Sequence, residues 1–274
     1  MFRTLFSKMT ITTILLAASS LTSWAASPIA DKALEVEIRR IIQEPMGDLT
    51  DEKLLKLFIL EAPGKSIKDL TGLEKCKNLA LIRLSNNQIS DIKPIKDLVN
   101  VQSLDLAGNK ITDIKPIAGL IKLQYIELSG NQVSDISALE KLTALNAIYM
   151  GNNKIADISS IKNLAKLSSL SLPKNQISNL APLASVTRIS TLDLSDNQVS
   201  DLAPLSKQTD LRMLIIERNK VADLKPLVDS CKADFAAGKR FAPFLRLYLA
   251  GNPLGGESAK QLEELKAAGV RKES

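Results

Sequence analysis

Asparagine recurs at a fixed spacing of 22 residues, and this spacing constrains the fold more than any other feature of the sequence. A repeat of this length indicates stacked units, because one such unit is too small to bury its own apolar residues and must bury them against its neighbours. Seven asparagines share the register without interruption: Asn87, Asn109, Asn131, Asn153, Asn175, Asn197 and Asn219.

The aliphatic residues of each unit recur in the same register. Before the asparagine, apolar residues alternate with others, as Ile82 and Leu84 do, which predicts a short strand with one side turned inward. The asparagine turns the chain, and its amide can bond the backbone of its own and the neighbouring turn to form a ladder. Asp91 and Pro94 then mark the segment that turns the chain back. We therefore expect a curved solenoid with a parallel sheet along one face.

This pattern resembles the leucine-rich repeat family in its 22-residue form, and most of all the bacterial internalin-type repeats, which share a Ser-Asp-Ile-x-Pro-Ile stretch. The resemblance covers about residues 57–256. It implies an α/β repeat solenoid, an arc with a concave parallel β-sheet, and a role in protein–protein interaction. Internalin-type surface proteins usually carry a wall anchor or further C-terminal modules. Neither occurs in this sequence, so we do not expect attachment to a host cell.

The register extends in both directions to about nine units, two of them irregular. Lys65 replaces the asparagine of a degenerate first unit. Asn252 follows the last regular asparagine by 33 residues, one period plus 11, which places Phe244 on a leucine position. The insertion is predicted within about residues 228–243, with a short helix at 229–237 that ends at a glycine.

The segments outside the repeats are predicted to cover the ends of the solenoid, which would otherwise expose the core. Residues 26–56 are predicted to form an N-terminal helical cap, because residues 31–43 carry apolar side chains at helical spacing. Residues 257–274 are predicted to form a C-terminal capping helix and a polar tail.

Residues 1–25 are predicted to be a secretory signal peptide. Arg3 and Lys8 precede an apolar run that is too short to remain as a membrane-spanning helix, and Ser23 and Ala25 fit a cleavage site. An uncleaved anchor helix is the alternative. We expect an exported protein, periplasmic or secreted, that is not an integral membrane protein after cleavage.

Composition limits the chemistry that the chain can perform. Histidine is absent, which excludes histidine relays and histidine metal ligands. Cys76 and Cys231 fall on units too far apart for a bridge, so we expect buried free thiols, with an intermolecular bridge through Cys231 as the alternative. The net charge of +6 is a small excess without runs of like charge, which argues against nucleic-acid binding. We expect no cofactor, no metal and no nucleic-acid partner.

The register also identifies the side chains of the predicted strands that face solvent. All three tyrosines of the chain fall on these positions, and tyrosine is favoured at interfaces. The candidate partner-binding residues form an acidic and aromatic patch (Asp105, Tyr125, Glu127 and Tyr149), a largely apolar patch (Met213, Ile215, Arg246 and Tyr248), and Asp193 on the same face. The asparagine ladder, including Asn252, is predicted to be structural.

The function predicted from these features is that of an exported, monomeric, non-catalytic module that binds another protein through its concave face. The alternative is an envelope-associated structural scaffold or a carbohydrate binder, in which residues suited to strands merely cover a solvated sheet. A hydrolase that uses Asp105 and Glu127 is disfavoured, because an open sheet provides no enclosed pocket.

Overall fold

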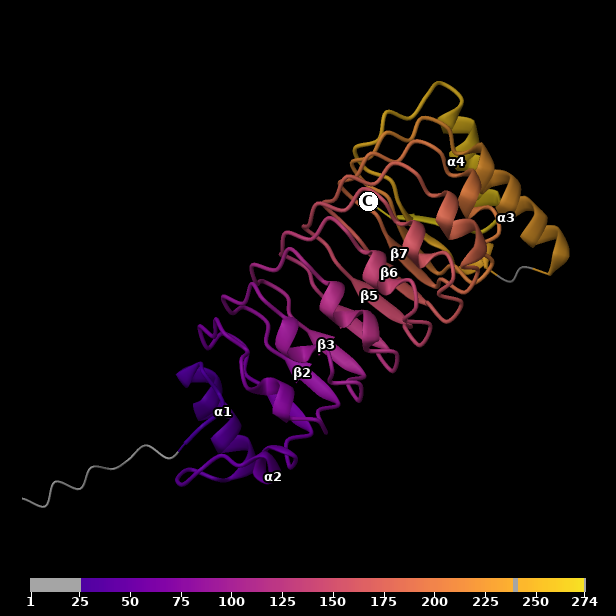
Figure 1. Cartoon of the computed structure of the whole chain (residues 1–274). Helices are drawn as coiled ribbons and strands as arrows, with labels where there is room; N and C mark the ends of the chain where they lie inside the picture. The colour runs from indigo at the N-terminus through magenta and orange to yellow at the C-terminus, as the bar shows by residue number, and fades with distance from the viewer. Residues whose placement is uncertain (1–25, 239–240, 274) are drawn as a thin grey trace, which may run out of the picture.

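The computed structural model describes residues 26–238 and 241–273, which form an elongated stack of similar turns (Figure 1). The predicted signal peptide, residues 1–25, lies outside the described residues. No helix in the described ranges combines the length and the apolar character that a membrane span requires.

One parallel sheet runs along the stack, with its strands in chain order. From β1 to β8, each strand pairs with the next at a shift of 22 residues, as Ile82 does with Leu104. This confirms the parallel sheet that the repeat predicts. The strands are β1 (Ile59–Glu61), β2 (Leu81–Arg83), β3 (Ser103–Asp105), β4 (Tyr125–Glu127), β5 (Ala147–Tyr149), β6 (Ser169–Ser171), β7 (Thr191–Asp193), β8 (Met213–Ile215), β9 (Arg246–Tyr248) and β10 (Arg271–Glu273).

Short helices return the chain from one strand to the next. Proline lies in the first turn of five of the described 3-10 helices, η2, η3, η6, η7 and η8, where its fixed φ suits the start of a helix. The 3-10 helices are η1 (Leu73–Lys75), η2 (Lys93–Ile95), η3 (Lys115–Gly119), η4 (Ser137–Leu139), η5 (Ser159–Ile161), η6 (Ala181–Ser185), η7 (Ala203–Leu205) and η8 (Ala242–Phe244). The α-helices are α1 (Lys32–Ile42), α2 (Asp51–Leu54), α3 (Lys225–Ala237) and α4 (Ser258–Ala267).

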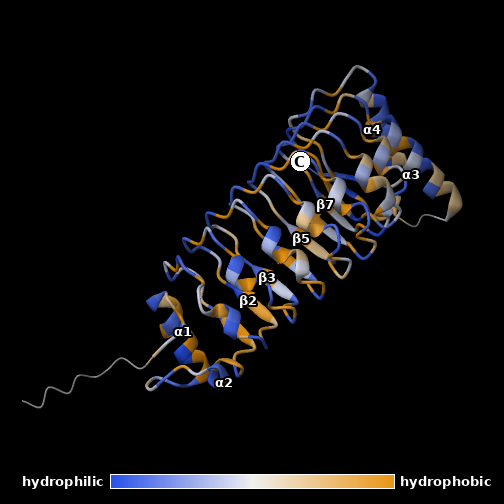
Figure 2. Ribbon diagram, viewed as in Figure 1, coloured by the Kyte–Doolittle hydropathy of each residue, from blue (hydrophilic) through white to orange (hydrophobic). Residues whose placement is uncertain are grey.

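The core is one continuous cluster of aliphatic side chains that extends from Ile29 to Val270. Hydrophobic residues recur from unit to unit along the stack (Figure 2). The central residue of each strand from β1 to β9 is buried, as Ile126 and Ile148 are, and the residues on either side of it face outward. Each unit therefore contributes one layer of the core and depends on its neighbours to cover that layer.

The asparagine side chains join successive units by the same set of hydrogen bonds. Asn109 Oδ1 accepts a hydrogen bond from Ile89 N at 3.0 Å, and its Nδ2 donates to Leu84 O at 3.0 Å and Leu106 O at 2.9 Å. The other asparagines of the register, from Asn87 to Asn252, make equivalent bonds. One amide thus satisfies backbone groups of two adjacent units, which holds the units in a fixed relation.

The N-terminal helices lie at one end of the stack and are tied to the first unit (Figure 1). Asp31 caps α1 by accepting from Ala33 N and Leu34 N, and its other oxygen accepts from Lys68 N at 2.8 Å. Burial alone would raise the pKa of Asp31, but the backbone donors outweigh it and lower the pKa. Lys65, which stands in the place of an asparagine, has its Nζ 2.7 Å from Glu37 Oε1 in α1.

At the other end of the stack, α3 packs beside α4, with Lys232 Nζ 3.1 Å from Glu264 Oε2. Helix α3 begins at Lys225, earlier than the predicted start at residue 229, and ends at Gly238. The polar tail contributes β10, which pairs in parallel with β9 and extends the sheet. The sequence analysis did not predict this strand, because its residues are charged and it is held through backbone bonds such as Arg271 N to Leu245 O at 2.9 Å.

The placement of Phe244 on a buried leucine position was wrong. Phe244 is 57% exposed, and Phe241 and Leu245 are buried in its place. The reason is the 3-10 helix η8, which directly precedes β9 and shifts which residues point inward. The exposed ring of Phe244 instead lies under the Arg212 guanidinium, 5.3 Å from its Cζ.

The prediction of buried, unbridged thiols is confirmed. Cys76 and Cys231 are both free and fully buried. Burial in apolar surroundings raises the pKa of each thiol to about 12, so neither is a reactive thiolate at neutral pH.

Among the described residues, Gln208 is a buried polar side chain with one unpaired polar atom. Gln208 occupies the position that holds Leu164 and Val186 in the two preceding units, and it is 1% exposed. Its Nε2 donates to Leu183 O at 2.8 Å, but its Oε1 has no hydrogen-bond partner within the described residues.

We predict that Gln208→Leu stabilises the protein by about 1–2 kcal/mol, because it removes an unsatisfied buried carbonyl and restores an apolar side chain. Urea denaturation measures the change in the free energy of unfolding. Gln176→Leu, at an exposed position, is the matched control and should leave stability nearly unchanged. Destabilisation by Gln208→Leu would show that the amide bond to Leu183 outweighs the unpaired oxygen.

Candidate functional site

The candidate surface is the sheet face, which we define as the outward-facing first and third residues of strands β1 to β9. The pleat of each strand places these two residues on the side opposite to the buried central residue. All nine residues predicted to bind a partner occupy such positions, and eight of them are partly buried, while Arg246 is exposed.

The acidic and aromatic patch comes together on three adjacent strands. Asp105 is the register partner of Glu127, and Glu127 is the register partner of Tyr149. The rings of Tyr125 and Tyr149 are 5.6 Å apart between centroids and inclined at 41°. Tyr149 OH also lies 2.9 Å from Ser169 Oγ, so Tyr149 contacts Tyr125 through its ring and Ser169 through its hydroxyl. We call Asp105, Tyr125, Glu127 and Tyr149 the aromatic–acidic patch.

Three carboxylates of the sheet face, on β3, β4 and β7, have local partners that were not predicted from the sequence. Each accepts a hydrogen bond from the backbone N–H two residues further on: Asp105 from Ala107 N at 3.1 Å, Glu127 from Ser129 N at 2.7 Å and Asp193 from Ser195 N at 3.0 Å. Asp193 also accepts from Ser195 Oγ at 2.8 Å. These acids therefore stabilise the turns that follow their strands, in addition to any contact with a partner.

The second oxygens of these carboxylates have different surroundings. Asp105 Oδ2 lies 3.7 Å from Arg83 Nε, and Arg83 NH1 is 2.6 Å from Glu61 Oε1. Glu127 Oε2 has no hydrogen-bond or ion-pair partner within the part of the chain that the structure describes. The negative charge of Glu127 is thus the least neutralised in the aromatic–acidic patch.

The second predicted patch lies on β8 and β9, where Met213 pairs with Arg246 and Ile215 pairs with Tyr248. The Arg246 guanidinium lies over the Tyr248 ring, 5.7 Å from its centroid, and donates to Tyr248 OH at 2.6 Å. Its Nε also donates to Glu273 Oε1 at 3.0 Å. Glu273 belongs to β10, so the sequence analysis missed this residue, and Arg246 is more fully paired than its exposed position suggested.

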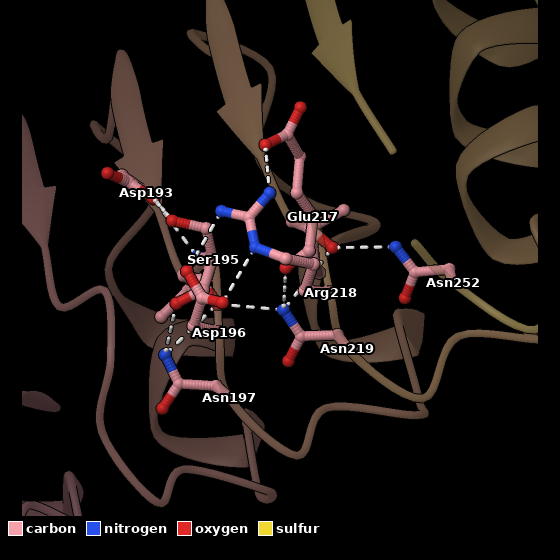
Figure 3. Close-up of polar contacts among 10 residues, drawn as sticks. Asp193, Ser195, Asp196, Asn197, Glu217, Arg218, Asn219 and Asn252 are labelled. Atoms are coloured by element: carbon pink, nitrogen blue, oxygen red, sulfur yellow. Dashed lines mark hydrogen bonds and ion pairs between the residues drawn. The ribbon is translucent and has the colours of Figure 1, made fainter. Parts of the chain in front are cut away.

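A polar cluster beside the sheet face was also missed. Arg218 binds Asp196 through Nε at 2.6 Å and NH2 at 2.9 Å, and its NH1 bonds Glu217 Oε2 at 2.8 Å (Figure 3). Asp196 and Arg218 both have positive φ, at the turn position where other units have Gly108 and Gly130. The cluster joins the turns after β7 and β8 next to the asparagine ladder, and Arg218 pairs with both carboxylates of the cluster.

Exposed apolar residues mark the N-terminal end of the sheet face. Phe58 is 57% exposed and Ile59 is 51% exposed, and Ile59 is the register partner of Leu81 on β2. The repeat register places Ile59 and Leu81 on the sheet face, so the sequence held the signal for this group, but the prediction did not single it out.

The electrostatics of the sheet face differ from those of the whole chain. The chain has a net charge of +6, yet the sheet-face positions from β3 to β8 hold three carboxylates and no lysine or arginine. Burial raises the pKa of Tyr125, and the charges of Glu127 and Asp105 raise it further. Among the described residues, no group of three or more acidic or thiol side chains is arranged to hold a metal ion.

Comparisons with known proteins agree with this architecture. The model for leucine-rich repeats in two copies matches residues 77–119, 99–141 and 121–163. Internalin C2 of Listeria monocytogenes is 30% identical, with a TM-score of 0.71 over 73% of this chain and 89% of that one. Internalin F of the same organism is 26% identical, with a TM-score of 0.63 over 90% and 92% of the two chains.

A leucine-rich repeat protein of Leptospira interrogans shares the fold at 19% identity, with a TM-score of 0.70 over 86% of this chain and 68% of that one. No curated protein matches the sequence.

Proposed function

Because the chain belongs to the leucine-rich repeat family, in its internalin-like form, we propose that it is an exported, non-catalytic module that binds another protein through the sheet face. Proteins with this fold are commonly protein-binding modules and are typically not enzymes. The signal peptide predicted at residues 1–25 supports export.

The observation that carries this proposal is the pair formed by Tyr125 and Tyr149. The two rings lie on adjacent strands of the sheet, remain partly exposed and contact each other, and the hydroxyl of Tyr149 is also within hydrogen-bond distance of Ser169 Oγ. A partner that covers these rings removes their apolar surface from water and loses little conformational entropy, because the rings are already ordered. Such rigid aromatic side chains are the usual anchors of protein interfaces.

The second patch gives the sheet face a further contact point. Met213 and Ile215 provide apolar surface beside the Arg246–Tyr248 pair. Between the two patches the sheet face carries the small side chains of Ser169, Ser171 and Thr191, which project little from the sheet. This arrangement suits a partner that contacts the face at two places along the stack.

Affinity capture tests the proposal. The full chain is used to capture proteins from envelope fractions and culture medium, in parallel with a variant that carries Tyr125→Ala, Tyr149→Ala and Tyr248→Ala. Circular dichroism and urea denaturation establish that the variant is folded. We expect a protein that the parent retains and the variant loses. Equal retention by both would contradict a sheet-face interface, and retention of wall carbohydrate alone would support the scaffold or carbohydrate-binding alternative.

A further inference from the structure

We infer that the aromatic–acidic patch receives a cationic side chain, an arginine or lysine from a basic segment of the protein partner. The inference rests on the proposed function and specifies the chemistry of its partner. The cation would lie against the Tyr125 and Tyr149 rings with its charge directed at the Glu127 carboxylate. Tyrosine rings attract cations through their faces, and a carboxylate beside them adds a charge-assisted hydrogen bond.

Charge complementarity is the first support. The described strands β3 to β8 place Asp105, Glu127 and Asp193 on the sheet face, and no cation of the chain occupies a sheet-face position there, although the whole chain has a net charge of +6. The excess of lysine and arginine therefore lies elsewhere on the molecule. A basic partner segment is attracted to the carboxylates of this part of the face.

The neighbouring strands show how this face binds a cation. On β2, Arg83 lies between two carboxylates, with NH1 2.6 Å from Glu61 Oε1 and Nε 3.7 Å from Asp105 Oδ2. Two strands further along, on β4, Glu127 is flanked by Asp105 and Tyr149, and its Oε2 has no partner among the described side chains. The chain supplies the cation at the first position, and we infer that the partner supplies it at the second.

The environment of Tyr125 shows the effect of the same two carboxylates. After burial, the charges of Glu127 and Asp105 are the causes that raise its pKa, so its ring lies in a negative field. Arg83 acts in the opposite direction and offsets only part of that field. A bound cation would be stabilised by the same field.

Tyrosine emission provides a direct test, because the chain has three tyrosines and a single tryptophan, Trp24. The full chain with Trp24→Phe is titrated at low salt, up to millimolar concentrations, with a capped peptide of alternating glycine and arginine. The same peptide with glutamate in place of arginine is the control probe. We expect the arginine peptide to change the emission and the glutamate peptide to leave it unchanged.

Variants then locate the effect. Asp105→Asn and Glu127→Gln remove the charges and keep the oxygens that accept from Ala107 N and Ser129 N, so the turns should stay intact. Together they should weaken binding of the arginine peptide by roughly tenfold, the effect of losing charge-assisted contacts. Asp201→Asn is the matched control, since its carboxylate also accepts from the backbone N–H two residues further on, Ala203 N at 2.8 Å, but it lies outside the sheet face, and it should change affinity by less than about twofold.

Three outcomes would overturn the inference: no response to the arginine peptide, an equal response to the glutamate peptide, or equal weakening by Asp201→Asn. The captured protein partner separates this inference from the proposed function. If the tyrosine variant loses that partner and the Asp105→Asn, Glu127→Gln variant keeps it, the cation site is wrong and sheet-face binding stands. If the tyrosine variant keeps the partner, sheet-face binding itself is wrong.

Discussion

Asn153→Ala is expected to lower the free energy of unfolding by about 3 kcal/mol, because it leaves Val133 N inside the stack without a partner and removes one of the two side-chain bonds to each of two carbonyls. Asn153 Oδ1 accepts from Val133 N at 2.9 Å, and its Nδ2 donates to Leu128 O at 3.0 Å and Met150 O at 3.1 Å. These groups belong to two adjacent units, and alanine can replace none of the bonds. Urea denaturation of the parent and the variant measures the loss.

Asn179→Ala is the matched control for this prediction. It makes the same chemical change at a surface turn, where the side chain accepts one bond, from Ala181 N at 2.9 Å. The expected loss there is about 0.5–1 kcal/mol. Equal losses for the two variants would mean that the ladder bonds contribute no more to stability than an exposed turn does.

Gly72→Ala is expected to destabilise the N-terminal end of the stack by about 3–5 kcal/mol, from backbone strain together with displacement of a buried side chain. Gly72 has a φ of +100°, and an added Cβ would meet the Pro28 carbonyl group and come within 2.8 Å of Ile29 Cα. Ile29 is 2% exposed and belongs to the core, so the segment cannot move away without exposing it. Urea denaturation gives the loss, and hydrogen exchange shows whether residues 26–43 lose protection.

Gly64→Ala separates the two causes. Gly64 also has a positive φ, +67°, but an added Cβ would meet no atom within 4 Å. Its expected cost is therefore about 1 kcal/mol, from backbone strain alone. If Gly72→Ala costs no more than Gly64→Ala, the contact with residues 28 and 29 does not hold the N-terminal segment in place.

The sequence predicted the regular part of the fold because the same asparagine hydrogen bonds repeat from unit to unit. Each asparagine bonds the turn before it and its own turn, so the strands must align at the 22-residue shift that the asparagines show. Alternating apolar residues then settle which side chains face inward, as for Ile82 and Leu84. Positions on the sheet face could therefore be assigned by counting alone.

The prediction of the fold failed in the two segments that lie outside the regular 22-residue repeat. The insertion before β9 ends in a 3-10 helix, so Leu245 rather than Phe244 is buried, although the spacing to Asn252 is regular. Strand β10 has no apolar alternation, because it pairs at the edge of the sheet by backbone bonds. A pattern of side chains carries no signal for either feature.

The sequence predicted which residues lie on the candidate site, but it did not predict which contacts these residues make. The repeat register placed Tyr125 and Tyr149 on adjacent strands, which the structure shows as a ring pair. It gave no indication that Arg246 would bond Glu273, which lies 27 residues away in the polar tail. It also did not predict that Glu127 bonds the turn that follows it, since that bond depends on local backbone geometry.

The most direct test of the central claim is the dissociation constant of the captured protein partner, measured by calorimetry. It is compared among the parent, the triple tyrosine variant and a control with Lys96→Ala, Lys141→Ala and Lys166→Ala, three exposed residues outside the sheet face. We predict that loss of the tyrosines weakens binding by roughly 30-fold or more, as for anchor residues of an interface, while the lysine variant binds as the parent does. The reverse order would contradict recognition through the sheet face.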